Sequence, residues 1–341
     1  MSEAPHIRIN LPDRSYQASV RSEIRKLAIT AGFSNCRLGE VEIITAEITS
    51  NLWKHTDKGG YLLVRVMLLP EPGIEIIAID DGPGMGTPHL MMEDGRSTKK
   101  TLGNGLGAIR RLANVFDLYS LKGWGTILFI RCYVNKLYRE EDNKGFQINA
   151  LCVCKKGQVV CGDSWEYTHT GNKIRLLMVD GLGHGPAANH AAEEAVQNFV
   201  NLPKRDPTEQ IRSLHNKMKK SRGGVAHVAY IDYGNQKITY SGVGNVVMKL
   251  IHSARVKGCY SYNGIVGLIM PSSINNHMLP WHYNDIILMH TDGISPRWDI
   301  QKYPDILKYH PIILCSAIYK DFDRGNDDAT ILIGKFIKQF P

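Results

Sequence analysis

Apolar residues recur at spacings of three and four along some stretches of the chain, and runs of β-branched and aromatic residues fill others. The first pattern is typical of amphipathic helices, and the second of strands between turns. Helices are predicted at residues 15–30, 38–55, 186–199, 207–219 and 303–318, with one short helix opening near residue 105. Strands are predicted at residues 61–69, 74–79, 146–154, 174–179, 225–232, 237–241, 286–290 and 329–333, with a strand pair around 117–133.

A charged stretch at residues 135–145 separates two regions with different patterns. Before it, helices combine with a mostly antiparallel sheet, which predicts an α+β sandwich; after it, strands dominate, which predicts a β-sandwich flanked by helices. The length of 341 residues also exceeds the usual size of one domain. We therefore expect an α+β protein with domains at residues 1–134 and 146–341 and a linker at 135–145.

The composition is that of an ordinary soluble protein, with 43% hydrophobic and 22% charged residues. No apolar run reaches the roughly 18 residues that cross a bilayer, and the first residues lack the basic and apolar regions of a signal peptide. We therefore expect a cytoplasmic protein with no membrane partner. The net charge of +8 is spread along the chain, and its densest cluster, at residues 217–222, is interpreted as a solvated helix end, so no nucleic-acid partner is expected.

Seven cysteines are scattered along the chain without a Cys-x-x-Cys pair. Their odd number and spacing indicate reduced thiols rather than a disulfide framework or a zinc site. None is followed six residues later by arginine, as the phosphate-binding loop of a cysteine-dependent phosphatase requires. Catalysis by cysteine is therefore not expected.

Aspartates stand at four strand ends of the second region, namely at Asp163, at Asp180 before Gly181, at Asp292 before Gly293, and at Asp327 with Asp328. A single Asp-Gly pair is more often a turn than a metal ligand. A set of carboxylates on strand ends, however, supplies the oxygen ligands that Mg²⁺ and Mn²⁺ prefer. The set therefore predicts a divalent-metal site.

The motifs around these aspartates resemble the PPM-type metal-dependent protein phosphatases, in particular the SpoIIE and RsbX branch that dephosphorylates regulators of bacterial sigma factors. In order along the chain, the matching segments are Gly162 to Trp165, Val179 to Gly185, Gly242 to Asn245, Thr291 to Ile294, and Asp327 to Thr330. The resemblance implies a PPM-type β-sandwich that holds two Mn²⁺ or Mg²⁺ ions. The implied ligands are Asp180 as the bridge, Asp163, the Gly181 carbonyl, Asp292 and Asp327, with Asp328 as the alternative to Asp327.

This resemblance further implies a serine/threonine phosphatase. In such a centre two ions activate a water molecule for attack on phosphorus and neutralise the phosphoryl oxygens. The implied partner is a phosphorylated STAS-domain protein, either an anti-anti-sigma factor or a stressosome-like regulator. Whether the chain forms a homodimer stays open.

A second set of polar and glycine residues marks the first region. Glu47 and Asn51 are spaced i, i+4, so they project from one face of the predicted helix at 38–55. Two glycine-rich boxes follow, residues 80–84 directly after a predicted strand and residues 103–107 at the start of a helix. Glycine permits close backbone approach, and a helix N-terminus offers N–H groups to phosphate. A complete Walker loop and the motifs of eukaryotic-type kinases are absent from the sequence.

The order Glu-x-x-x-Asn, Asp-x-Gly-x-Gly and Gly-x-Gly-x-Gly resembles the GHKL ATPases, and residues 92–98 are similar to RsbT, the small anti-sigma-type serine kinase. The resemblance covers residues 8–134 and implies a GHKL-type α/β sandwich that binds ATP and Mg²⁺. It implies that Glu47 activates the substrate hydroxyl, Asn51 holds Mg²⁺ and Asp80 reads the adenine amino group. The other implied nucleotide-binding residues are Gly82, Gly84, Gly103, Gly105, Leu106, Gly107 and Thr126.

Three hypotheses follow for the whole chain. In the first, a serine kinase and a phosphatase act in one molecule on STAS-type regulators. In the second, the first domain senses nucleotide or a partner and regulates the phosphatase without transferring phosphate. In the third, which ranks lowest, the chain is a catalytically inactive adaptor. ADP formation by the wild type and by Glu47→Ala distinguishes the first two.

Overall fold

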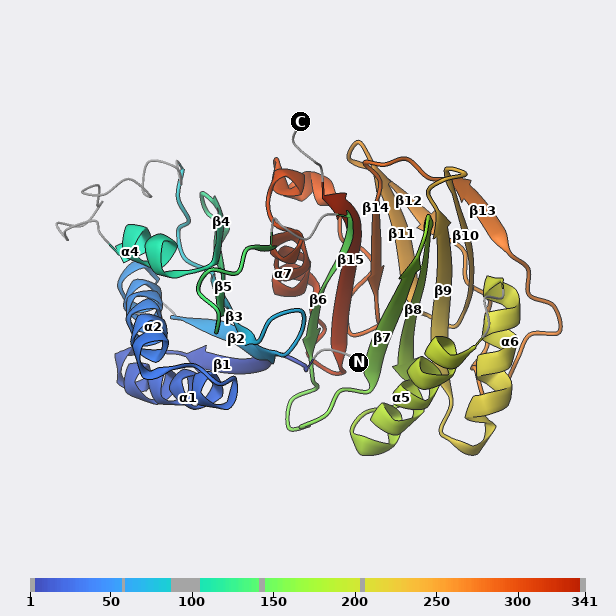
Figure 1. Cartoon of the computed structure of the whole chain (residues 1–341), viewed down its shortest axis with the longest axis horizontal. Helices are drawn as coiled ribbons and strands as arrows, with labels where there is room; N and C mark the ends of the chain where they lie inside the picture. Colours follow the sequence, from blue (N-terminus) through green and yellow to red (C-terminus); the bar gives the residue numbers. More distant parts are fainter. Residues whose placement is uncertain (1–3, 57–58, 87–104, 141–144, 203–205, 338–341) are drawn as a thin grey trace. The chain divides into compact units, whose positions relative to one another are not determined.

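The computed structural model of the chain describes residues 4–56, 59–86, 105–140, 145–202 and 206–337 (Figure 1). The chain forms two compact units. The amino-terminal unit comprises His6–Asn143 and Asp305–Lys320, and the carboxy-terminal unit comprises Lys144–Pro304 and Asp321–Pro341 together with Met1–Pro5. The segment Asp305–Lys320, which the sequence placed in the second domain, therefore lies with the amino-terminal unit.

The amino-terminal unit contains an antiparallel five-stranded sheet with the strand order β1-β2-β3-β5-β4. Its strands are β1 (Ile7–Leu11), β2 (Gly60–Met67), β3 (Gly73–Asp80), β4 (Val115–Leu121) and β5 (Gly125–Tyr133). Its helices are α1 (Gln17–Thr30), α2 (Asn35–His55), α4 (Gly105–Leu112) and most of α7 (Pro311–Phe322).

One face of this sheet packs against helices. Alternate residues of β3, Ile74 and Ile76, are fully buried in the core that Ile44 and Ile48 of α2 also enter. Ser34 caps α2 by accepting a hydrogen bond from the backbone N–H of Arg37, which satisfies a donor that the first helical turn leaves open. Periodicity of this kind is why the sequence located α1 and α2.

The opposite face of the same sheet packs against the segment Asp305–Lys320. The ring of His310 stacks on Phe129 with centroids 4.4 Å apart, and Tyr309 meets Tyr119 edge-on at 5.0 Å. Residues 311–319 are all buried, so α7 has no polar face. The helix begins at Pro311, later than the predicted 303–318, because two 3-10 turns, η4 (Ile300–Lys302) and η5 (Ile306–Lys308), precede it.

The carboxy-terminal unit is a sandwich of two five-stranded sheets, ordered β13-β10-β9-β8-β7 and β12-β11-β14-β15-β6 (Figure 1). The strands are β6 (Gly145–Val153), β7 (Asp163–Thr170), β8 (Lys173–Gly181), β9 (Gly224–Asp232), β10 (Lys237–Val243), β11 (Val247–His252), β12 (Arg255–Cys259), β13 (His277–Pro280), β14 (Ile286–His290) and β15 (Ala329–Ile337). Helices α5 (Pro186–Asn201) and α6 (Pro207–Lys217) complete the unit.

Two apolar layers hold this unit together. Met178 of β8 and Met289 of β14 share the core between the two sheets. Leu177 and Val179, which alternate with Met178, face the other way and pack with α5 and α6. Among the described residues, no helix combines the length and hydropathy that a membrane span requires.

Candidate functional site

The pairing of β7 with β8 places two aspartates opposite each other. In this antiparallel register Asp163 is the partner of Asp180, and residues directly opposite have neighbouring side chains. Asp163 begins β7, and Asp180 precedes Gly181, the last residue of β8. The backbone N–H of Gly181 donates to the carbonyl of Gly162 at 3.0 Å, which extends the ladder past the two aspartates.

The second sheet contributes its strand ends to the same place. Thr291, directly after β14, donates its hydroxyl to Asp163 Oδ2 at 2.8 Å. The same hydroxyl accepts the backbone N–H of Thr330 on β15 at 3.0 Å. Asp292 follows Thr291, and its Oδ2 accepts a hydrogen bond from the Asn245 amide at 2.7 Å. A buried hydroxyl thus joins the aspartate of one sheet to the strand ends of the other.

Asp163 lies in an environment that opposes its ionisation. Burial is the largest influence and raises its pKa to about 7, and the charges of Asp328 and Asp292 act in the same direction. Hydrogen bonds from Thr291 and Thr330 oppose this shift. A nearby cation favours the charged form of a carboxyl group that is buried beside other carboxylates.

Asp180 is crowded in the same way. Burial and the negative charges of nearby aspartates raise its pKa well above the ordinary value of 3.8; these aspartates are Asp163, Asp292, Asp327 and Asp328. The structure therefore brings together all the aspartates that the sequence singled out in this region. Their oxygen donors fit hard divalent cations such as Mn²⁺ and Mg²⁺, which supply the positive charge that the cluster lacks.

Asp327 and Asp328 have different surroundings. Both carboxylate oxygens of Asp328 accept backbone N–H groups, from Lys155 at 2.7 Å and from Gly162 at 2.8 Å. Asp327 is half-buried and uses one oxygen to accept the N–H of Asp328 at 2.9 Å. Asp328 thus ties the loop before Asp163 to the start of β15, whereas Asp327 keeps an oxygen that these hydrogen bonds do not use.

Glycine is needed at two positions because the backbone passes close by. A Cβ atom on Gly181 would lie 2.2 Å from the carbonyl oxygen of Ala188, and one on Gly293 would lie 2.0 Å from that of Asp328. Real Cβ atoms do not approach backbone oxygen so closely. Glycine therefore lets the end of β8 pack against α5 and lets the segment after β14 pack against the start of β15.

Three polar residues around the aspartates were not assigned a role from the sequence. Thr291 donates a hydrogen bond to Asp163, and Asn245 donates one to Asp292. Both residues belong to the sequence motifs described above, but the motifs did not indicate these contacts. Arg222, assigned to a solvated helix end, has its Nη1 atom 3.2 Å from the place of a Cβ on Gly183. Its charge therefore lies beside the loop that follows Asp180.

The amino-terminal unit brings Glu47 and Asn51 of α2 to the start of α4. A Cβ on Gly105 would lie 2.6 Å from Glu47 Oε2 and 3.9 Å from Asn51 Nδ2. Gly107 is buried, and Leu106 packs against the core rather than pointing away from it. Gly103, the first residue of the predicted box, lies outside the described residues.

Asp80 ends β3 and begins the first glycine box, residues 80–84. Its Oδ1 accepts the backbone N–H of Gly82 at 2.7 Å. Burial raises the pKa of Asp80, and hydrogen bonds from the amides of Gly82 and Thr126 partly offset the effect. Thr126 also shares a hydrogen bond of 2.9 Å with Ser120. Gly84 has φ +66°, and a Cβ there would lie 1.9 Å from the carbonyl oxygen of Leu121, so this turn requires glycine.

Lys320 of α7 lies beside the same glycine box. Its ammonium group forms an ion pair with Asp81, the neighbour of Asp80. It also lies over the ring of Trp124, 4.6 Å from the centroid, in the hairpin that connects β4 and β5. The Lys320 side chain is 6% exposed, whereas that of Asp81 is 77% exposed, so solvent screens the carboxylate and the ion pair contributes little to stability.

Comparison with known proteins gives a separate match for each part of the chain. The model of the family "Stage II sporulation protein E (SpoIIE)" matches residues 170–336. The phosphoserine phosphatase RsbX of Bacillus subtilis is 27% identical over 157 residues, which are 46% of this chain and 78% of RsbX. The serine/threonine-protein kinase RsbT of the same organism is 34% identical over 102 residues, which are 30% of this chain and 77% of RsbT.

Two solved structures resemble part of this chain. One, from work on the bacterial stressosome as a modular system, superposes with a TM-score of 0.52 and 22% identity, covering 56% of this chain and 99% of that chain. RsbX in complex with magnesium superposes with a TM-score of 0.49 and 23% identity, covering 57% and 97% of the two chains. At 22% identity the first superposition indicates a common fold alone.

Proposed function

We propose that this chain is a metal-dependent phosphatase of phosphoserine or phosphothreonine in a sigma-factor regulator. Its residues 170–336 match the SpoIIE family, and its amino-terminal part belongs to the family of RsbT. The observation that carries the proposal is the convergence of the aspartates on the paired ends of β7 and β8.

Within this centre we assign the two ions, Mn²⁺ or Mg²⁺, to Asp180, Asp163, the Gly181 carbonyl, Asp292 and Asp327. Bound ions of this kind supply Lewis acidity and activate water. We assign Asp327 rather than Asp328 because both oxygens of Asp328 already accept backbone N–H groups. Thr291 and Asn245 orient Asp163 and Asp292 through their hydrogen bonds.

The proposed substrate is a STAS-domain protein phosphorylated on serine or threonine. RsbX is by its name a phosphoserine phosphatase, and the chain covers 78% of it. The purified full chain should release phosphate from such a protein when Mn²⁺ is present, and should lose this activity when EDTA removes the metal. Restoring Mn²⁺ or Mg²⁺ should restore the rate, whereas equal rates with and without EDTA would refute a metal-dependent phosphatase.

For the amino-terminal unit we propose an ATP site. The start of α4 meets Glu47 and Asn51, and Asp80 with Gly82, Gly84 and Thr126 lines the end of β3. There Asp80 would accept from the adenine amino group, Asn51 would hold Mg²⁺ and Glu47 would take the proton from a substrate hydroxyl. The match to RsbT supports a serine kinase.

The path of the chain favours a second candidate, in which this site regulates the phosphatase. The segment Asp305–Lys320 lies in sequence between Asp292 and Asp327, yet it packs in the amino-terminal unit. Just beyond Lys320, the carbonyl of Phe322 accepts the N–H of Ser295 at 2.9 Å, and Arg324 N–H donates to the Gly293 carbonyl at 2.9 Å. A few residues therefore connect the partner of Asp81 to the neighbours of Asp292.

If nucleotide binding shifts Lys320, a non-hydrolysable ATP analogue should change the phosphatase rate about fivefold, the lower end of common allosteric couplings. Lys320→Gln should reduce this change, because it removes the charge that pairs with Asp81. Lys308→Gln is the matched control, since Lys308 belongs to the same segment and pairs only with exposed Asp305 in the ion pairs described. Glu47→Ala should keep the analogue effect and lose any ADP formation; an analogue without effect on the wild type would exclude regulation of this kind.

A further inference from the structure

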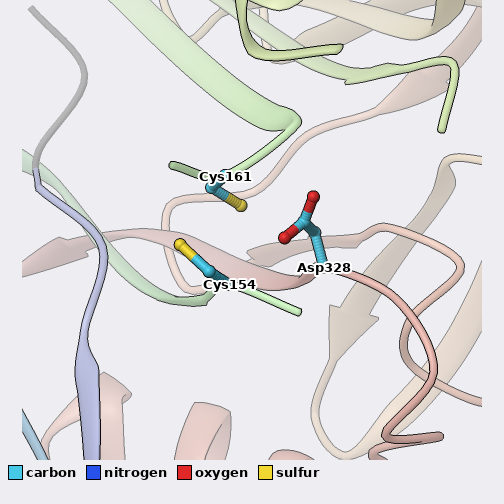
Figure 2. Close-up of side chains that lie close together, drawn as sticks. All are labelled: Cys154, Cys161 and Asp328. Atoms are coloured by element: carbon cyan, nitrogen blue, oxygen red, sulfur yellow. The ribbon is translucent and has the colours of Figure 1, made fainter. Parts of the chain in front are cut away.

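Three cysteine thiols lie close to one another and near Asp163. Cys152 is in β6, Cys154 directly follows β6, and Cys161 stands two residues before β7. The sulfurs of Cys152 and Cys161 are 3.2 Å apart, and both residues are buried. Figure 2 shows the side chains of Cys154 and Cys161 close together, with the carboxylate of Asp328 beside them. The segment at residues 155–160 therefore reverses the direction of the chain and brings the thiols of Cys152 and Cys161 into contact.

The backbone around Cys161 is tied to the candidate metal centre. Its carbonyl accepts the side-chain amide of Asn189 at 2.9 Å, and the next residue, Gly162, donates its N–H to Asp328. Asp163 follows immediately, and its carboxylate accepts the hydroxyl of Thr291. Cys161 therefore lies two residues before Asp163 on a stretch of backbone that these hydrogen bonds hold in place.

The ligand atoms of Cys154, Cys161 and Asp328 lie within 4.8 Å of one another, a spacing that a metal ion can also use. The observations favour a thiol pair instead. Asp328 already directs both oxygens to backbone N–H groups. The sulfurs of Cys152 and Cys161 are 3.2 Å apart, so this contact needs to close by only about 1 Å to reach the length of a disulfide bond.

We propose that Cys152 and Cys161 form a reversible disulfide that inhibits the phosphatase, with hydrogen peroxide as the oxidant. One thiol is oxidised by peroxide to a sulfenic acid and water is released; the second thiol then attacks that sulfur, releasing a second water and forming the S–S bond. Two thiols thus lose two electrons and two protons, and one peroxide is reduced to two waters. The inhibitory part of this inference rests on the proposed phosphatase function.

Inhibition follows from the position of the bond. Drawing Cys161 toward β6 by about 1 Å pulls on Gly162 and Asp163, whose geometry the hydrogen bonds from Gly162 and Thr291 now define. Catalytic groups tolerate displacements of only about 0.5 Å, and misplacement by about 1 Å can cost a factor of about 100 in rate. We expect at least a tenfold loss of activity, reversed by a reducing agent such as dithiothreitol.

Peptide mapping tests the bond without reference to activity. Trypsin cleaves after Lys155 and Lys156, between the thiols, so the disulfide joins peptides 145–155 and 157–173. After peroxide treatment of the full chain, this joined pair should appear under non-reducing conditions in the wild type and in Cys154→Ser. It should be absent in Cys152→Ser. No joined pair in the wild type, or a pair that persists in Cys152→Ser and disappears in Cys154→Ser, would overturn the assignment.

Activity measurements test the consequence. Peroxide followed by removal of the oxidant should lower phosphate release by the Mn²⁺-loaded wild type and by Cys154→Ser, but not by Cys152→Ser. Equal inhibition of Cys152→Ser would contradict the proposal. One equivalent of tightly held zinc in the untreated chain would show a metal site in its place. An untreated chain without phosphatase activity would instead refute the proposed function, while the joined peptides would still decide the thiol pairing.

Discussion

Replacing Asp180 by asparagine is expected to lower phosphate release from a phosphoserine protein about a thousandfold in the presence of Mn²⁺. Asparagine keeps the shape of the side chain and removes the negative charge that we assign to both ions. A bound metal contributes several kcal/mol to stabilising the charge of a transferring phosphoryl group, and about 4 kcal/mol corresponds to a factor of about 10³ in rate. The measurement is steady-state phosphate release by the wild type and the variant at saturating Mn²⁺.

The matched control is Asp232→Asn. Asp232 belongs to the same sheet but stands at its other end, opposite Lys173, with which it forms an ion pair of 3.7 Å. We expect its activity within about twofold of the wild type, since surface substitutions change little. An Asp180→Asn variant as active as this control would contradict the assignment of Asp180.

Metal-free stability separates loss of a ligand from loss of the fold. Burial and the surrounding aspartates raise the pKa of Asp180, so its charge destabilises the folded state near pH 7 when metal is absent. The metal-free Asp180→Asn variant should therefore melt at or above the temperature of the metal-free wild type. Adding Mn²⁺ should raise the melting temperature of the wild type alone, because only it binds the ions tightly.

Replacing Glu75 by alanine is expected to lower the free energy of unfolding of the amino-terminal unit by about 3–5 kcal/mol. Glu75 is fully buried on β3. Its carboxylate lies 2.7 Å from His6 Nε2, 2.8 Å from Arg65 Nε and 2.5 Å from Arg131 Nε. Removing it leaves two buried guanidinium groups without the carboxylate between them. Denaturation of the full chain, with hydrogen exchange of β3 and β5 to locate the change, measures the loss.

Glu42→Ala is the control for this substitution. Glu42 pairs with Arg25 at the surface, where the two side chains are 42% and 52% exposed. An exposed pair of this kind contributes less than about 1 kcal/mol. If Glu75→Ala lowers the free energy of unfolding no more than Glu42→Ala does, the buried charges do not stabilise this sheet, contrary to what their contacts indicate.

The same group predicts a pH dependence. Burial raises the pKa of Glu75, but the charges of Arg131 and Arg65 and the hydrogen bond from His6 outweigh it and hold the pKa well below the ordinary value of 4.5. The unfolded chain therefore takes up a proton first as the pH falls. The stabilisation is complete above about pH 4.5 and is lost as the pH falls through the folded pKa. Below pH 4.5 the wild type should lose stability more steeply than Glu75→Ala.

The sequence predicted helices and strands correctly where one face of the element is exposed to water. The helices α1, α2, α5 and α6 and most core strands have a periodicity that burial explains. The strand β7 was missed because Asp163–Thr170 is polar along most of its length and is buried only at its first three residues. Pairing with β8 makes it a strand, and a strand formed by its partner has no local signal.

The candidate metal site was visible as separate motifs. Aspartates beside glycine at strand ends marked Asp163, Asp180 and Asp292 individually, and the register of β7 with β8 then placed two of them side by side. The sequence left Asp327 and Asp328 as alternatives. The hydrogen-bond partners of Asp328, which lie more than 160 positions away in the sequence, distinguish the two residues.

The sequence by itself determined the two regions of the chain, their amphipathic helices and strands, and the carboxylates that suit a hard cation, because these depend on local periodicity and side-chain chemistry. Only the tertiary structure decided that α7 packs with the amino-terminal unit and that Cys152 meets Cys161. A helix that is apolar on every side specifies burial and no particular partner. Whether two thiols are in contact depends on the path of the chain between them, and the spacing of the cysteines in the sequence does not determine that path.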